Sequence, residues 1–439
     1  MDTKRPANSE ISINSELLLF APPSTNSGIQ QVKWVNCAPL NQLTSSGDVE
    51  IQISGSGSAY LDLSRTLLYV KAKILKADGT DIASDEKVGA VNFFLHSLWA
   101  QMDIDFQQKQ VCSTGSNYAY KAILDAYIEY GRDAKLSKLQ AALYFKDSSV
   151  AMNTADPDPK DASIPENKGL KARWQLTKGG AEVDMIGVPM AHIFELDRYI
   201  INGVGVRVRM VQTKNAFRLM AANSEQYKVL LKEVTIKACK IYVDPAIIQA
   251  HNESIKNTPA IYPFMESDIK SFAIAKGSYL ITLDDVYQGK VPSRLVCAIV
   301  RADAYSGSYQ LNPFSFEHCN IDSFICYADN HALPSNGIIT KFSSNSYQEA
   351  YHALFSNTDL SSPDRGTDIT REDFQNGNAI FVFDLDPHSR TPSVLPARRA
   401  GNLSLEIRMA VPLPWTATLL CYAKFPSQIQ IDHARAIIL

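Results

Sequence analysis

The sequence predicts an all-β protein made of two tandem eight-stranded jelly rolls with short helical insertions. Three observations predict this fold: period-two alternation dominates the chain, helical patterns are few and short, and the order of strands, helical insertion, long loop and further strands occurs twice. Alternation gives a strand one buried and one solvated face, which is typical of antiparallel sheets. Since an all-β domain often takes about 200–250 residues, a chain of 439 residues accommodates two of them.

The composition is that of a globular protein and excludes several classes of function. Hydrophobic residues make up 45% of the chain and charged residues 20%, which excludes a disordered protein. The 43 basic and 46 acidic residues give a net charge of −3 without a basic tail, so we expect no strong direct binding of nucleic acid. No apolar run reaches the roughly 20 residues that span a bilayer, and the N-terminus lacks the apolar stretch of a signal peptide, so we expect neither a transmembrane segment nor secretion.

The seven cysteines indicate reduced thiols. Their number is odd, they are scattered along the chain, and no CxxC pair occurs. Four of them lie in apolar strand-like runs, where cysteine behaves as a small buried hydrophobic residue. We therefore expect free thiols and folding inside a cell. The four are Cys239, Cys297, Cys326 and Cys421.

Strand patterns recur from the first third of the chain to its end. In one of them Leu403, Leu405 and Ile407 fall on the same face. Two other runs, 295–300 and 380–383, are apolar on both faces and suit strands covered on each side. The alternating runs are 68–74, 101–107, 203–210, 234–243, 402–409 and 415–421. Within 234–243 the apolar phase slips by one residue, which predicts a β-bulge.

Helical spacing is confined to short segments. Residues 120–131 and 134–145 carry apolar residues on one side, and Gly131 is suited to end the first of these helices. Ser346 and Glu349 form a capping-box pattern ahead of a third helix. Asp244 and Pro245 are an N-cap and first-turn pair that opens a fourth.

The fourth helix falls at the midpoint of the chain and is followed by the polar stretch HNESIKNTPA, so we place the domain boundary there. Residues 1–45 are expected to form an N-terminal arm, residues 46–245 the first jelly roll and residues 246–439 the second. Three long segments without periodicity are expected to be loops that pack no core. These segments are 146–171, 357–378 and 386–400.

No motif predicts a catalytic, cofactor-binding or metal site. The Gly-rich stretch SGSGS at 54–58 lacks the context of a phosphate-binding loop and is expected to be a mobile connection between strands. Asp384 and Asp386 share one face of a strand, as paired catalytic or metal-binding carboxylates do, but a strand that runs into a Pro-containing loop explains them. The sequence therefore predicts that the protein is not an enzyme and has no cofactor.

Histidine and cysteine side chains also form no recognisable site. His318, Cys319 and Cys326 have the chemistry of zinc ligands but not the CxxC spacing, so packed thiols are favoured. No GxSxG or HExxH motif occurs, and no Cys/His pair of the protease type. Three further histidines in apolar surroundings are expected to be core or interface residues. They are His96, His192 and His352.

Six segments, which keep one order between residues 48 and 439, carry a resemblance to a known family. They are YLDLSRTLLYVKAKI (60–74), VNFFLHSLWAQMDIDFQQKQV (91–111), YAYKAILDAYIEYGRDAKLSKLQ (118–140), EVDMIGVPMAHIFELDRYIINGVGVRVRMV (182–211), YQGKVPSRLVCAIVRADAYSGSYQLNPFSFEHCNI (287–321) and RRAGNLSLEIRMAVPLP (398–414). This pattern resembles the double-jelly-roll, hexon-like major capsid proteins of Polinton/Maverick elements, adintoviruses and the adomavirus-like group. None of the segments is a catalytic signature.

The resemblance implies a structural major capsid protein without enzymatic activity. Three chains would form a pseudo-hexagonal capsomer, and capsomers would build the icosahedral shell of a double-stranded DNA virus. The implied partners are two further copies in a homotrimer, neighbouring capsomers, and penton and minor capsid proteins. The implied location is the virion, with synthesis in the host cytoplasm and assembly in the nucleus.

The alternative is a penton, a spike or another β-sandwich binding module, of a virus or a domesticated element, that would bind through 146–171 and 357–378. These loops would then carry exposed aromatic residues or acidic metal ligands. The aromatic residues on the helical segments are expected to lie in the core or in contacts between subunits, with the core favoured. They are Tyr118, Tyr120, Tyr127, Tyr130 and Phe355.

Overall fold

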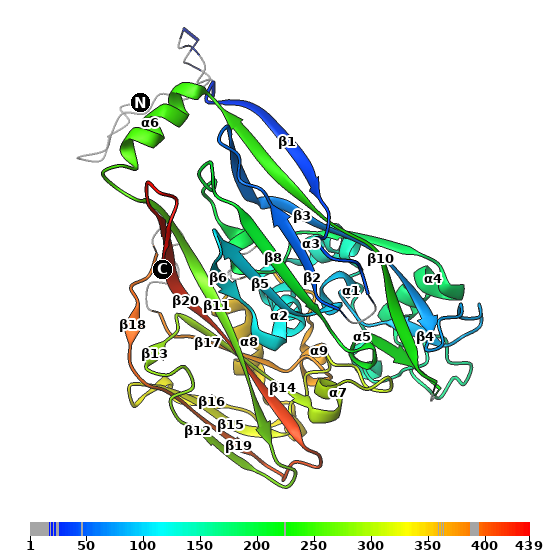
Figure 1. Cartoon of the computed structure of the whole chain (residues 1–439). Helices are drawn as coiled ribbons and strands as arrows, with labels where there is room; N and C mark the ends of the chain where they lie inside the picture. The colour runs from blue at the N-terminus through cyan, green and yellow to red at the C-terminus, as the bar shows by residue number, and fades with distance from the viewer. Residues whose placement is uncertain are drawn as a thin grey trace.

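The strands of the chain form two β-sandwich lobes that lie side by side (Figure 1). The computed structural model describes residues 17, 19–20, 22, 26–44, 47–223, 225–358, 360, 362, 364–386 and 395–439. We call the sandwich formed by β1 to β10 the first lobe and the one formed by β11 to β21 the second lobe. Apolar side chains from the facing sheets fill the core of each.

The first lobe contains two four-stranded antiparallel sheets. One sheet has the order β1 (Ile29–Cys37), β10 (Tyr227–Val243), β3 (Ala59–Lys76), β7 (Val183–Gly187). The other has the order β2 (Val49–Ile53), β8 (Val206–Gln212), β5 (Trp99–Phe106), β6 (Lys109–Ser113). Among the eight strands of these two sheets, the first, β1, thus lies beside the last, β10, and the second, β2, beside the last but one, β8, as in a jelly roll. A two-stranded ribbon joins β4 (Val88–Ala90) to β9 (Leu219–Ala221).

The second lobe repeats this strand order. One sheet has the order β11 (Ala260–Ile274), β20 (Ala417–Ile431), β14 (Arg294–Arg301), β17 (Ile380–Asp384), with β21 (Ile437–Ile438) also paired to β20. The other has the order β12 (Leu280–Leu283), β19 (Leu403–Met409), β15 (Ile321–Ala328), β16 (His331–Ile339). A ribbon joins β13 (Lys290–Val291) to β18 (Arg399–Ala400). The predicted fold class of two eight-stranded jelly rolls is confirmed.

The strand patterns have the physical origin that the sequence indicates. The alternating residues of β19 alternate in burial, with Leu403, Leu405 and Ile407 in the core. The apolar run of β17 is buried on both faces because helix α8 (Gln348–Ser356) packs against this edge strand. The phase slip in β10 is a β-bulge, where the register with β3 shifts between Lys237 and Cys239.

The helices match the predictions in part. Helix α2 (Tyr118–Glu129) lies where periodicity places it, and helix α6 (Pro245–Ser254) begins after Asp244, whose side chain accepts a hydrogen bond from the Ala246 N–H. The helix expected over 134–145 is wrong: Ser137, with φ of −127° and ψ of −94°, separates helix α3 (Arg132–Leu136) from a 3₁₀ turn (Lys138–Ala142).

The capping box expected at Ser346 is also wrong. Helix α8 follows Tyr347 without a side-chain cap. A capping box is present instead at the start of helix α9 (Arg371–Gln375), where Thr370 and Asp373 bond to each other's backbone N–H groups. The other described α-helices are α1 (Phe94–Ser97), α4 (Lys168–Thr177), α5 (Asn215–Arg218) and α7 (Ala302–Ser306).

The long helical insertions occupy equivalent positions in the two lobes. Helices α2, α3 and α4 lie between β6 and β7, and α8 and α9 lie between β16 and β17. The expectation that 146–171 and 357–378 pack no core is wrong, because Ala151, Leu170 and Phe374 are buried. Of the third expected loop, residues 387–394 lie outside the described residues.

Helix α6 connects β10 of the first lobe to β11 of the second (Figure 1). Strand β1 belongs to the segment expected as an N-terminal arm, yet it pairs with β10 along most of its length. Residues 1–16 of the expected arm lie outside the described residues. The division into 1–45, 46–245 and 246–439 stays a prediction.

Candidate functional site at the contact between the lobes

Helix α2 of the first lobe lies against β20 of the second lobe. Its sequence YAYKAILDAYIE combines good helix formers with apolar residues on nearly every face, and all its residues but the last are buried. A helix that is apolar all round is buried between layers rather than solvated on one side. The helix is therefore held between the two sandwiches, and its three charged residues are buried with it or border the contact.

Aromatic rings make the apolar part of this contact. The ring of Tyr120 stacks on that of Tyr305 with centroids 5.6 Å apart and meets the ring of Phe314 edge-on at 5.8 Å. The ring of Tyr127 meets Phe316 edge-on at 6.2 Å. Since both tyrosines belong to the first lobe and their partners to the second, the rings join the lobes across about two turns of helix.

Buried charges make the polar part. The ammonium group of Lys121 lies 2.6 Å from Oδ2 of Asp125, and both side chains are at most 2% exposed. The hydroxyl of Tyr422, on β20, donates to Oδ1 of Asp125 at 2.6 Å. Lys424, also on β20, forms an ion pair with Glu129. The helix is thus bonded through its carboxylates to a central strand of the second lobe.

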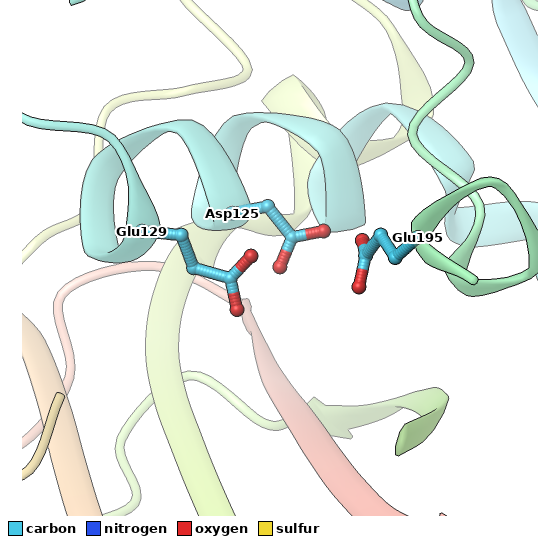
Figure 2. Close-up of side chains that lie close together, drawn as sticks. All are labelled: Asp125, Glu129 and Glu195. Carbon is cyan, nitrogen blue, oxygen red and sulfur yellow. The ribbon is translucent and has the colours of Figure 1, made fainter. Parts of the chain in front are cut away.

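Glu195 completes an acidic cluster with Asp125 and Glu129. Figure 2 shows the three carboxylates turned toward one another, two from α2 and one from the turn after His192. Among the described residues they are the group whose metal-binding atoms lie within 4.8 Å of one another. However, Lys121 and Lys424 already supply positive charge to Asp125 and Glu129. The geometry is that of an ion-pair network between lobes rather than of a cage of free ligands.

The charge balance of this network shifts its pKa values. Burial raises the pKa of the Glu129 carboxyl to about 7, and repulsion by Asp125 and Glu195 adds to this effect, while Lys424 opposes it. Burial alone would lower the pKa of Lys121, but the carboxylates of Asp125, Glu195 and Glu129 outweigh it and raise that pKa. The pKa of Lys424 is raised in the same way. Three carboxylates beside two ammonium groups leave one negative charge uncompensated, and this excess contributes to the raised pKa of Glu129.

This balance predicts a pH dependence of stability. The pKa of Glu129 in the folded chain, about 7, exceeds the unfolded value of about 4.3. The protonated carboxyl therefore stabilises the fold fully below the unfolded pKa, and this contribution is lost as the pH rises through about 7. The unfolding free energy of Glu129→Gln minus that of the unchanged protein should therefore increase by about 2–3 kcal/mol as the pH rises from about 5 to about 8. Urea titrations of both proteins across this range measure it. The control Glu253→Gln, at an exposed position of α6, should show the same dependence of the unfolding free energy on pH as the unchanged protein. If Glu129→Gln shows this same dependence too, the raised pKa is not that of Glu129.

A second contact joins the insertions of the two lobes. Buried Lys135, in α3, forms an ion pair with Asp368 at 2.7 Å and donates to the Thr367 hydroxyl at 2.6 Å. Lys146 of the first insertion pairs with Asp373 of the second at 2.5 Å. This contact adjoins α2, because Lys135 and Thr367 both donate to the Tyr127 carbonyl, at 3.3 and 3.0 Å. It extends the joined surface of the lobes from α2 to the two insertions.

A Cys–His–Ser trio also lies where the lobes meet, and sequence reasoning missed it. Nδ1 of His192 is 3.0 Å from the Ser267 hydroxyl and 3.8 Å from Sγ of Cys112. It also accepts the Ser267 N–H at 3.2 Å, so its proton is on Nε2. A cavity of about 710 Å³, lined by Cys112 and Ser267, lies beside the trio.

The electrostatics of this trio oppose catalysis. Burial raises the pKa of the Cys112 thiol to about 12 and lowers the pKa of His192 to about 3. A thiolate–imidazolium nucleophile needs shifts in the opposite directions. The trio is therefore a packed, hydrogen-bonded junction between β6, β11 and the turn that holds His192.

The other residues singled out from the sequence lie apart from the contact. The Asp386 N–H donates to Asp384 Oδ1 at 3.2 Å, so this pair shapes the chain after β17. The ring of His318 stacks on Phe342, the thiol of Cys319 points to the Glu317 carbonyl, and Cys326 is buried on β15. The residues of the SGSGS stretch, 54–58, form the connection between β2 and β3.

The structure tests the core part of the predictions for the aromatic and histidine residues, and the interface part stays a prediction. His96 is buried and bonds to the Tyr118 hydroxyl at 2.9 Å, but His352 is exposed on α8 and does not lie in the core of the chain. The core assignment is confirmed for three of the aromatic residues, and two others are half-buried. The buried ones are Tyr118, Tyr120 and Tyr127, and the half-buried ones Tyr130 and Phe355.

Known proteins resemble the chain mainly in fold. No protein-family model matches it. An uncharacterized protein of Caenorhabditis elegans is 24% identical over 434 residues, which are 94% of this chain and 98% of that protein.

Among the described residues, no helix is both long and apolar enough to cross a membrane.

Solved viral structures match over nearly the whole length. The Sputnik virophage structure matches with a TM-score of 0.63 and 13% identity, over 100% of this chain and 94% of its counterpart. The Faustovirus major capsid protein matches with a TM-score of 0.59 and 9% identity, over 95% and 93%. The mavirus major capsid protein matches with a TM-score of 0.51 and 12% identity, over 100% and 96%. The chain therefore has the double-jelly-roll fold of viral major capsid proteins.

Proposed function

We propose that this chain is a major capsid protein that trimerises into pseudo-hexagonal capsomers and builds the icosahedral shell of a double-stranded DNA virus or related element. The observation that carries the proposal is the pair of lobes with one strand order, fixed against each other by α2 and by the joined insertions. A trimer of such chains presents six similar lobes, which suits a near-flat lattice of capsomers. The domain limits 46–245 and 246–439 are proposed as the two units of this design.

The rigid contact between the lobes supports an assembly role. A capsomer transmits contacts from each neighbour to the next, so its two lobes must keep one relative orientation. Buried ion pairs and aromatic stacking along α2 and at the adjoining insertions meet this requirement. The same feature is not needed by a sugar-binding or receptor-binding sandwich, whose function depends on its loops.

The chemistry of the clusters supports a role without catalysis. The Cys112–His192 pair has pKa shifts opposite to those of a nucleophile, and the carboxylates of α2 are engaged by lysines. We propose that the partners are two further copies, neighbouring capsomers, and penton and minor capsid proteins. The proposed location is the virion, with synthesis in the host cytoplasm and nuclear assembly.

Membership of the Polinton/Maverick, adintovirus and adomavirus-like group is the finer proposal. The six sequence segments support it, as does a relative of nearly equal length in an animal. An element carried in animal genomes would account for such a relative.

Assembly can be tested on the purified full-length chain. Size-exclusion chromatography with light scattering at micromolar concentration should give the mass of a trimer, because obligate interfaces bury more than roughly 2,000 Å² and persist on dilution. Negative-stain images of the same fraction should show flat particles with triangular or hexagonal outlines. A persistent monomer would contradict the trimer, and a monomer that binds glycans would favour the binding-module alternative.

A further inference from the structure

Two cysteines of the second lobe lie directly opposite each other in the core. Cys297 on β14 and Cys421 on β20 are paired residues of adjacent antiparallel strands. Their sulfur atoms are 3.9 Å apart, and both side chains are fully buried. All seven cysteines of the chain are free thiols, and Cys326, the other buried cysteine of this lobe, lies on β15 in the facing sheet.

The backbone around this pair already suits a disulfide. Opposite residues of antiparallel strands have Cα atoms about 4.5–5.5 Å apart, and disulfides join Cα atoms about 4.4–6.8 Å apart. The sulfur atoms need only approach from 3.9 Å to about 2.05 Å. Rotation of the two side chains supplies this approach, and the strands keep their register.

We propose that Cys297 and Cys421 are a modification site, where a peroxide oxidises the two thiols to a disulfide that ties β14 to β20. One thiol loses its proton, and the thiolate attacks an oxygen of the peroxide and breaks the O–O bond, which gives a sulfenic acid and a hydroxide that takes up the released proton as one water. The second thiol then displaces the hydroxyl of the sulfenic acid as a second water, and the S–S bond forms. Two thiols and one hydrogen peroxide thus yield one disulfide and two waters.

Burial makes this site slow to react in the folded protein. It raises the pKa of the Cys297 thiol well above its usual value, so little thiolate is present. Access runs past Tyr287, whose hydroxyl donates to the Cys421 carbonyl at 2.7 Å and whose ring lines the 710 Å³ cavity. Tyr287 thus bonds to one cysteine of the pair and borders the cavity, and we propose that a peroxide reaches the thiols when this side chain moves.

The disulfide would fix β20, the strand of the second lobe that contacts helix α2 of the first lobe. Cys421 directly precedes Tyr422, which bonds to Asp125 of α2. A disulfide between residues 297 and 421 closes a long loop, and such cross-links stabilise mainly by restricting the unfolded chain. The chemistry does not depend on the proposed function, although a shell that leaves a reducing cell would gain durability from it.

The test uses the full-length protein as purified under reducing conditions. After reductant removal, the protein is treated with hydrogen peroxide in a urea concentration below its unfolding transition, so that the core opens transiently. Intact mass and peptide mapping without reductant should show the loss of two hydrogens and a single linked pair, Cys297 with Cys421. The midpoint of thermal unfolding should rise by about 5–10 °C and return after treatment with a phosphine reductant.

Two variants and one control sharpen the result. Cys421→Ala and Cys297→Ala should each form no internal disulfide, whereas Cys326→Ala should form it as the unchanged protein does. If one variant fails to fold, the other variant and the peptide map of the unchanged protein still show whether Cys297 and Cys421 form the disulfide. Seven free thiols after treatment, or a linked pair that contains Cys326, would overturn the proposal.

Discussion

Replacement of Asp125 by asparagine should lower the free energy of unfolding by about 3–5 kcal/mol. The change leaves the shape of the side chain intact but removes the charge that faces Lys121 at 2.6 Å. The Lys121 ammonium group would lose the carboxylate that it contacts directly, and the loss of one partner of a buried pair costs more than the pair contributes when complete. Urea unfolding followed by near-ultraviolet and far-ultraviolet circular dichroism measures the loss.

Two further variants separate this effect from a general sensitivity to charge changes. Glu253→Gln, on α6, removes one partner of an exposed ion pair with Lys256 and should change the unfolding free energy by less than about 1 kcal/mol. The double change Asp125→Leu with Lys121→Met should recover much of the loss, because apolar residues often replace a buried pair well. A loss below about 1 kcal/mol for Asp125→Asn would show that Lys121 is satisfied elsewhere.

Replacement of Arg173 by alanine should cost a similar amount, about 3–5 kcal/mol. The guanidinium of this fully buried residue of α4 pairs with Asp147 at 2.6 Å and donates to the carbonyls of Ala90 and Phe145. The change would leave the buried Asp147 without its guanidinium partner, although the Asn312 amide would still donate to its Oδ2 at 2.9 Å. It would also release the first insertion from the β4 strand, so limited proteolysis within 146–171 should accelerate together with the loss of stability.

Lys171 provides the matched control on the same helix. Its side chain is about one-third exposed and pairs with Asp158 and Glu166. Lys171→Ala should therefore cost less than about 1 kcal/mol and leave the rate of proteolysis unchanged. Equal losses for both variants would show that the helix, rather than the buried guanidinium, is the sensitive element.

The strands were predictable because burial on one face leaves a direct mark in the sequence. Leu403, Leu405 and Ile407 alternate for that reason, and the phase slip before Cys239 is visible as a bulge. The insertions were not predictable in the same way. Asp147 looks like a loop residue by composition, and its burial depends on Arg173 across a turn that no periodicity indicates.

Only the α2 side of the contact between the lobes could be predicted from the sequence. Lys121, Asp125 and Glu129 follow each other at intervals of four on a recognisable helix, which is a visible pattern of paired charges. Tyr422 and Lys424 come from a strand almost 300 positions later, and nothing in their alternation indicates a partner. Pairs of this kind depend on the three-dimensional arrangement alone.

The position of β10 between β1 and β3 bears on how the chain can be synthesised. Translation delivers β1 and β3 long before their shared neighbour, so this sheet stays incomplete until Val243 has left the ribosome. The same holds for β11 and β14, which wait for β20 near the C-terminus. Nascent strands with open edges attract one another, and non-local pairing is slow. We therefore expect folding during synthesis to benefit from chaperones that shield each half-made sheet until its last strand emerges.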